Sequence, residues 1–330
     1  MSVPPEPTQF CEVVCANLKK TRDLFHFNEW VDSLGWKSEV QQAGPGAFEV
    51  QYDHCLCGPL AIAIVRASTK TIFQGEPPRG KVRMVLSLSG QDIGPQKGRM
   101  LRADNLIFLS SNRDSVICPD AGSCWVVVSV PFDVLSTAMW ANGRIDLQKE
   151  DAERMMTDVP DGLVPRIRYK VLDVLNGGGH SDCERNCSHG NELLALVCEA
   201  LALPVEKTSG YLKQQNRLRY VYQAKKLIDR RLSERIRILK LAEEVGVSNR
   251  TLELSFQDMF GMRPVEYIQN RRLNLARKLL LSGDERPTVR QVAEQCGIRH
   301  LGYFASGYRN LYGESPSDTL RRRPKRSVVE

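Results

Sequence analysis

The chain has 330 residues, enough for two domains that each bury a hydrophobic core. With 42% hydrophobic and 26% charged residues, its composition is that of an ordinary soluble protein and excludes a membrane-spanning or fibrous one. The net charge of +7 is uneven, because residues 211–330 hold 25 Lys and Arg against 13 Asp and Glu. Only this basic third is expected to bind a polyanion. The alternative interpretation is that its basic side chains simply form a solvated surface.

The N-terminus lacks the basic segment and apolar run of a signal peptide. No apolar stretch approaches the roughly 18 residues that cross a bilayer. These features predict a cytoplasmic protein with no membrane partner. Its ten cysteines are therefore expected to be reduced thiols and not a disulfide framework.

Residues 1–203 are predicted to form a β-rich region, about 35–131, followed by a helical one, 132–203. Short apolar runs rich in β-branched residues, bounded by Gly, Pro, Asn or Asp, predict strands separated by turns: Phe48–Tyr52, Leu60–Arg66, Val82–Leu88, Leu106–Leu109 and Trp125–Val130. Many short strands favour a barrel or a sandwich. The tryptophans could line a ligand pocket, although core packing is their more frequent role: Trp30, Trp36, Trp125 and Trp140.

Three segments after this region have helical apolar spacing: Asp133–Ala141, Gly162–Leu175 and Asn191–Leu203. The last has an apolar face that can bury against a second subunit or against its own β-rich region. Residues 204–218 are interpreted as a linker. Residues 219–323 are interpreted as an all-α domain whose first helix is Arg219–Leu232.

A group of cysteines and histidines lies beside a glycine-rich loop: His180, Cys183, Cys187 and His189. Such side chains can bind zinc, but this spacing matches no common structural zinc site, and no metal site is predicted. The chain also lacks a glycine-rich phosphate loop, a His-Glu-x-x-His motif and a nucleophile elbow. We therefore expect neither enzyme activity nor a cofactor.

Residues 239–260 have the pattern of a helix-turn-helix. Leu241, Ala242 and Val245 recur at helical spacing. Gly246 ends that helix, because glycine adopts a left-handed conformation cheaply, and Ser248 is a good N-cap for the next helix. The outer face of the second helix is polar: Asn249, Arg250, Glu253 and Gln257. Alone, this stretch is also compatible with an ordinary αα-hairpin.

Residues 289–312 repeat the pattern, with Gly297 as the turn glycine 51 positions after Gly246. The second helix of each unit is called its reading helix. In this second unit, the inner face of the reading helix is predicted to hold Leu301, Phe304, Tyr308 and Leu311. Between the units, Pro264–Leu281 is predicted to be one helix with proline at its first position. At 1.5 Å per residue it spans about 27 Å, close to the roughly 34 Å turn of B-DNA. One rod could therefore hold two reading helices in successive major grooves.

The run from Leu239 to Leu320 resembles the DNA-binding domain of the AraC/XylS family of bacterial transcription regulators. The matching residues fall at fixed spacing across both units and the helix between them: Leu241-Ala242, Val245–Ser248, Arg250–Leu252, Phe256, Gly261, Pro264, Tyr267-Ile268, Arg272-Leu273, Ala276, Leu279-Leu280, Val292-Ala293, Gly297, Phe304, Tyr308-Arg309 and Tyr312–Ser317. Ile298 and Leu254 depart from the family's usual residues, which bears on the base contacts and not on the fold.

The resemblance implies an α+β protein, in which a cupin-like jelly-roll barrel with following helices precedes the two helix-turn-helix units. It also implies a sequence-specific transcription regulator, more often an activator, that forms a homodimer and contacts RNA polymerase. A small-molecule effector is expected at the N-terminal domain. A rival hypothesis is a metal- or thiol-responsive DNA-associated protein that senses through its cysteines.

The residues expected to meet double-stranded DNA follow from helix geometry. Arg250 and Glu253 point outward early in the first reading helix, where arginine can bind guanine and glutamate can accept from cytosine; Asn249 and Gln257 come next. The second reading helix offers fewer base-reading groups: Arg299, His300, Gly302, Ser306 and Arg309. The connecting helix carries candidates for phosphate contacts or internal salt bridges: Arg271, Arg272 and Lys278.

Overall fold

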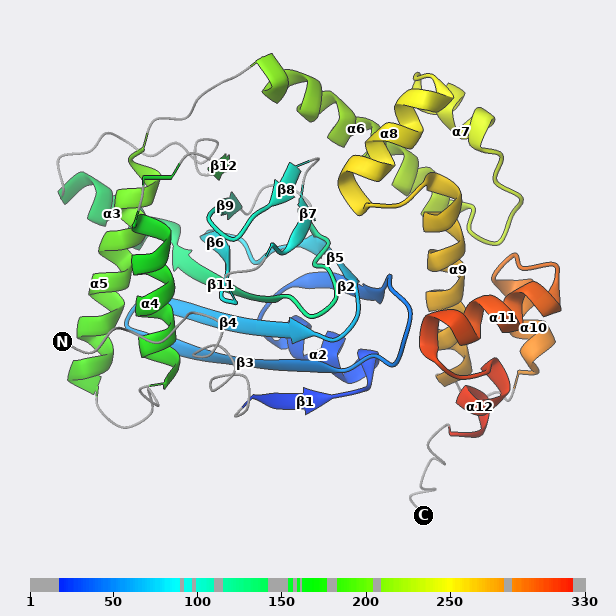
Figure 1. The fold of residues 1–330 in the computed structure, drawn as a ribbon, viewed down its shortest axis with the longest axis horizontal. Coiled ribbons are helices and arrows are strands. Elements are labelled where there is room, and N and C mark those ends of the chain that lie inside the picture. The colour runs from blue at the N-terminus through cyan, green and yellow to red at the C-terminus, as the bar shows by residue number, and fades with distance from the viewer. Residues whose placement is uncertain are drawn as a thin grey trace.

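The computed structural model describes residues 18–89, 92–96, 99–109, 115–141, 154–156, 159–160, 162–176, 183–203, 209–281 and 287–322. It is a mixed α/β structure, with a β-sheet region in its N-terminal half and a helical domain at its C-terminus (Figure 1). The strands are β1 Lys19–Thr21, β2 Lys37–Gln42, β3 Val50–Cys57, β4 Leu60–Ala67, β5 Thr71–Glu76, β6 Lys81–Ser87, β7 Gly94–Gln96, β8 Arg99–Leu101, β9 Leu106–Leu109, β10 Ser115–Ile117, β11 Cys124–Pro131 and β12 Arg154–Met156. The helices are α2 Leu24–Ser33, α3 Phe132–Ala141, α4 Leu163–Asn176, α5 Cys183–Leu201, α6 Ser209–Arg230, α7 Ile238–Val245, α8 Asn249–Phe260, α9 Pro264–Leu281, α10 Val289–Gln295, α11 Leu301–Tyr312 and α12 Pro316–Arg321.

The strands form a seven-stranded sheet in the order β1-β3-β4-β11-β6-β9-β12, a three-stranded sheet in the order β10-β5-β2, and the hairpin β7-β8. Neighbouring strands are antiparallel throughout. Over the described ranges these sheets are open. They form no closed barrel there, so the cupin-like jelly-roll barrel that the resemblance implied is not confirmed.

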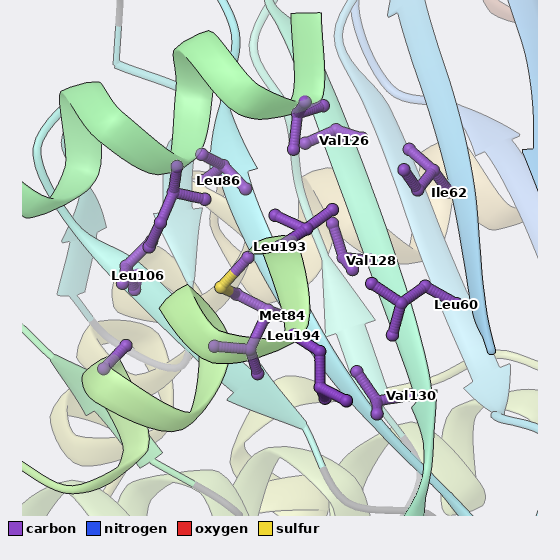
Figure 2. Close-up of a cluster of buried hydrophobic side chains, with 14 of the residues drawn as sticks. Leu60, Ile62, Met84, Leu86, Leu106, Val126, Val128, Val130, Leu193 and Leu194 are labelled. Atoms are coloured by element: carbon purple, nitrogen blue, oxygen red, sulfur yellow. The ribbon is translucent and has the colours of Figure 1, made fainter. Parts of the chain in front are cut away.

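The outer face of the seven-stranded sheet is covered by α3, α4 and α5 (Figure 1). Successive strand side chains alternate between faces, so Ile62 of β4 and Val128 of β11 point toward the helices. Figure 2 shows Leu193 and Leu194 of α5 among these side chains. The apolar face of α5 is thus buried against the chain's own sheet, which was one of the two interpretations that the sequence allowed; the other was packing against a second subunit.

The inner face of this sheet packs against α2 and the smaller sheet. Val65 and Trp125 share this core with Phe27 of α2. The rings of Trp125 and Phe73 meet edge to face, with centroids 5.2 Å apart. The two sheets therefore form a two-layered structure around an aromatic core.

Helix α6 begins at Ser209, ten positions before the predicted start at Arg219. This corrects the predicted linker, 204–218, over its described part. The segment after Gly210 is rich in Lys, Gln, Arg and Leu, which are good helix formers, and contains no proline to stop the helix.

Candidate nucleic-acid interface

The first helix-turn-helix consists of α7 and α8, joined at Gly246. Gly246 is left-handed with φ 79°, and the N–H of Val247 reaches back to the carbonyl of Ala242 at 3.0 Å. The Ser248 hydroxyl accepts from the N–H of Thr251 at 3.1 Å and so caps α8. Both local predictions for this turn are confirmed.

The outer face of α8 presents its polar side chains to solvent. Arg250, Glu253 and Gln257 are exposed, whereas Asn249 is half-buried. The Asn249 amide donates to the Glu253 carboxylate at 3.1 Å and holds it against the helix. Arg250 makes no hydrogen bond or salt bridge to any described residue. Its five N–H groups are therefore open to an external acceptor.

The second unit, α10 and α11, has the same geometry at a more crowded turn. Gly297 is left-handed with φ 71°, and an added Cβ would lie 2.6 Å from the Ser233 carbonyl oxygen. Thr288 and Gln291 form a capping box at the start of α10. The turn of the second unit therefore contacts the segment between α6 and α7, which leads into the first unit.

The predicted residues are exposed on α11 and directly before it, where His300 is the N-cap residue: Arg299, His300, Gly302, Ser306 and Arg309. The Ser306 hydroxyl already donates to the Tyr303 carbonyl at 3.2 Å. Sequence reasoning missed Tyr303, which is 77% exposed with its ring edge-on to His300. Leu301 is 39% exposed, so its predicted inner position is wrong. It is the first residue of α11, where no preceding turn lies beneath its side chain.

Two of the three candidate side chains on α9 bind other parts of the protein. Arg271 forms salt bridges with Glu39 of β2 at 2.7 Å and Asp229 of α6 at 2.9 Å. Arg272 donates to the carbonyls of Leu232 and Glu234. Lys278 is exposed and has no partner among the described residues. Of the three, Lys278 is thus the one whose side chain remains available to an external group.

Helix α9 also contacts the N-terminal sheets, which the sequence did not predict (Figure 1). The side-chain amide of Asn274 accepts from the backbone N–H of Gln42 at 3.2 Å and donates to its carbonyl at 2.9 Å. The Tyr267 hydroxyl donates to Gln74 of β5 at 3.4 Å. Ile72 and Val116 of the sheets join the core around α8 and α9. The two halves therefore share this hydrophobic cluster.

Cys57, Cys118, Cys124, Cys198 and Cys296 are buried free thiols, and Cys55 is a half-buried one. Burial raises the pKa of Cys55, Cys118 and Cys296 to about 12, so these groups are protonated at neutral pH. No group of three metal-binding side chains occurs within the described ranges. The predicted His180 lies outside them, as do the side chains of its neighbours Cys183 and Cys187. The Nδ1 atom of His189 lies 3.5 Å from the Oδ2 atom of Asp173.

Within the described ranges no helix has the length and hydropathy needed to cross a bilayer. Residues 241–322 match the family model described as a helix-turn-helix domain. The chain is 41% identical over 99 residues to the XylDLEGF operon transcriptional activator 1 of Pseudomonas putida, covering 29% of each protein. It is 38% identical over 90 residues to the probable thc operon regulatory protein of Rhodococcus erythropolis, covering 27% of each. The match thus spans less than a third of the length of these relatives.

Among solved structures, a probable AraC family transcriptional regulator from Rhodopseudomonas palustris is 38% identical. The match covers 32% of this chain and 98% of that one, with a TM-score of 0.30.

Proposed function

The chain belongs to the AraC/XylS family of transcription regulators, and from this premise we propose that it binds DNA sequence-specifically and activates transcription. The observation that carries the proposal is the pair of exposed polar faces, on α8 and α11, held on one connecting helix. Helix α9 has 18 residues and spans about 27 Å. The two faces can therefore enter successive major grooves on one side of a duplex.

The two reading helices divide the work of recognition. On α8, the unpaired Arg250 meets a guanine edge, and Glu253, oriented by Asn249, accepts from a cytosine amino group. Gln257 lies one turn further along the same face. Because α11 carries fewer side chains that can read bases, it contributes mainly phosphate contacts through Arg299 and Arg309.

The N-terminal half supplies control. We propose that a small effector acts through its two facing sheets, as the resemblance to the family implies. A homodimer and contact with RNA polymerase complete the proposal by family resemblance. The shared core and the Asn274 contact with β2 support direct transmission from the sheets to α9.

Selection of duplexes from a random library by the full chain tests this proposal. The enriched sequences should contain two conserved blocks about 10 base pairs apart, one per reading helix. Binding to the enriched duplex should exceed binding to a shuffled duplex by at least about 10³-fold, with an affinity that falls steeply as salt rises. Equal binding to both duplexes at moderate salt would contradict sequence-specific recognition.

A further inference from the structure

A cavity of about 250 Å³ lies between the two sheets of the N-terminal region. Ala63 of β4 and Trp125 of β11 line it from the large sheet. The other side is closed by Trp30 of α2, by Trp36, which directly precedes β2, and by Phe73 of β5. Ligand pockets for drug-sized molecules measure about 300–1,000 Å³, so this cavity suits a smaller body with apolar faces.

Buried polar atoms around the cavity are without hydrogen-bond partners in the described part of the chain. The Trp30 indole nitrogen and the Ser38 hydroxyl belong to residues that line it. Arg83 is 0% exposed, and its Nε and Nη1 are also unpaired. Native proteins pair nearly all such groups, because an unmade buried hydrogen bond is costly.

Arg83 does not itself line this cavity, but it lies next to several residues that do. It is two residues from Lys81 on β6 and opposite Ser129 of β11, and both of these residues line the cavity. Strand alternation puts Arg83 on the same face as Lys81. Its guanidinium carbon is 4.9 Å from the centroid of the Trp36 ring, and its Nη2 donates to the carbonyl of Pro78. Both of these neighbours also line the cavity.

The charge of Arg83 is uncompensated. None of the described carboxylates forms a salt bridge with it. Burial lowers its pKa to about 10, which still leaves the guanidinium charged at neutral pH. A buried cation is stable only when an anion or several acceptors replace the water it has lost.

We propose that this cavity binds a small apolar carboxylic acid, with its carboxylate toward Arg83 and its hydrocarbon body among the aromatic rings. Each of the unpaired groups can donate a hydrogen bond, so the ligand they lack is an acceptor, and the positive charge makes it an anion. The aromatic and alanine walls restrict the remainder of the ligand to apolar groups.

The cavity is also connected to the DNA-binding half. Gln74 lines it and accepts from the Tyr267 hydroxyl of α9. Ser38 lines it too, and the next residue along β2, Glu39, pairs with Arg271 of α9. An acid in the cavity thus acts on the elements that hold the connecting helix. This regulatory consequence rests on the proposed function, whereas the binding of the acid does not.

Binding is measured on the full chain by tryptophan fluorescence and calorimetry, since three of the lining residues are tryptophans. The probes are three acid and amide pairs of similar shape: phenylacetate and phenylacetamide, 3-phenylpropanoate and its amide, and hexanoate and its amide. The variants are Arg83→Met, which removes the charge at similar volume, and Ala63→Leu, which fills the cavity. Arg79→Met is the matched control, because Arg79 is exposed and four residues away.

At least one acid should bind in the millimolar range or tighter, and at least tenfold more tightly than its amide. Arg83→Met should lower the affinity for the acid to that for the amide, Ala63→Leu should abolish binding, and Arg79→Met should change neither. Circular dichroism must first show that each variant is folded. Acids that bind no better than their amides, or not at all, would overturn the proposal, as would an unchanged affinity in folded Arg83→Met.

DNA affinity is measured on the same samples with the duplex selected above. The bound acid should change the dissociation constant for DNA at least about fivefold. If the acid binds but DNA affinity does not change, the coupling is refuted. If the ligand-free chain does not discriminate between duplexes, the proposed function fails, whatever the result of the acid titration.

Discussion

Replacing Gly297 by alanine should destabilise the second helix-turn-helix more than the same change at Gly246 destabilises the first. Both glycines are left-handed, with φ 71° and 79°, so a Cβ strains either backbone by about 1–2 kcal/mol. The surroundings differ. A Cβ at Gly297 would lie 2.6 Å from the carbonyl oxygen of Ser233, whereas one at Gly246 would have no atom within 4 Å.

The crowded contact is with backbone, which cannot rotate away as a side-chain end could. The segment from Leu232 to Ser233 must therefore shift, and overpacking of this kind typically costs about 1–3 kcal/mol. Leu232 also accepts a hydrogen bond from Arg272, so a shift disturbs the end of α6 and the middle of α9 together. We expect Gly297→Ala to lose about 1–3 kcal/mol more than Gly246→Ala.

Urea unfolding of the full chain, followed by far-ultraviolet circular dichroism, measures this difference. With an m-value of about 2 kcal/mol/M, the transition of Gly297→Ala should fall by roughly 0.5–1.5 M more than that of Gly246→Ala. Hydrogen exchange should place the added loss in α10 and α11. Equal shifts in the two variants would refute the reasoning, because the clash with Ser233 would then contribute nothing.

The other predictions concern the contact between the halves, pH and the thiols. Asn274→Ala should lower the free energy of unfolding by about 2–3 kcal/mol in thermal denaturation, because two buried backbone groups of β2 lose their partner; an unchanged midpoint would show that the contact is not formed in solution. Hydrogen bonds from Ser315 hold the pKa of Asp318 below its unfolded value of 3.8. The ionised carboxylate therefore stabilises the folded chain above that pH, and this stabilisation is lost as the pH falls through the folded pKa. Asp318→Asn should therefore lose less stability than the parent on acidification below about pH 4, as measured by urea titration at several pH values. Burial raises the pKa of Cys118 and of Cys296 to about 12, so both thiols should resist iodoacetamide at about pH 8 until urea unfolds the chain. Alkylation of either cysteine before unfolding, detected by mass spectrometry, would contradict their burial.

The features that could be predicted from the sequence are those set by local chemistry. Gly246 and Gly297 end helices in the left-handed conformation that their spacing predicted, and Ser248 caps α8 through its own hydroxyl. The bounds of α9, Pro264–Leu281, also agree, because a proline at the first helical position and an uninterrupted run of good helix formers mark it.

The features that could not be predicted depend on contacts between distant parts of the chain. Asn274 and Gln42 are 232 positions apart, and nothing in either segment identifies the other. The same limit applied to Arg271, for which the sequence left both a phosphate contact and an internal salt bridge open. In the structure Arg271 forms salt bridges with Glu39 and Asp229. The cavity also depends on long-range packing, since Trp30, Trp36 and Trp125 line it while Trp140 is 79% exposed.

Comparing Arg250→Ala with Lys278→Ala on two duplexes tests the central claim most directly. Fluorescence anisotropy would give the affinity of each variant for the selected duplex and for an unrelated one at a fixed salt concentration. Arg250→Ala should cost roughly 1–3 kcal/mol on the selected duplex and much less on the unrelated one, because only the first offers the matching base. Lys278→Ala should weaken binding to both about equally, as loss of a phosphate contact does. If Arg250→Ala also lowers both affinities equally, Arg250 contacts phosphate, and α8 does not read bases in the way its exposed face indicates.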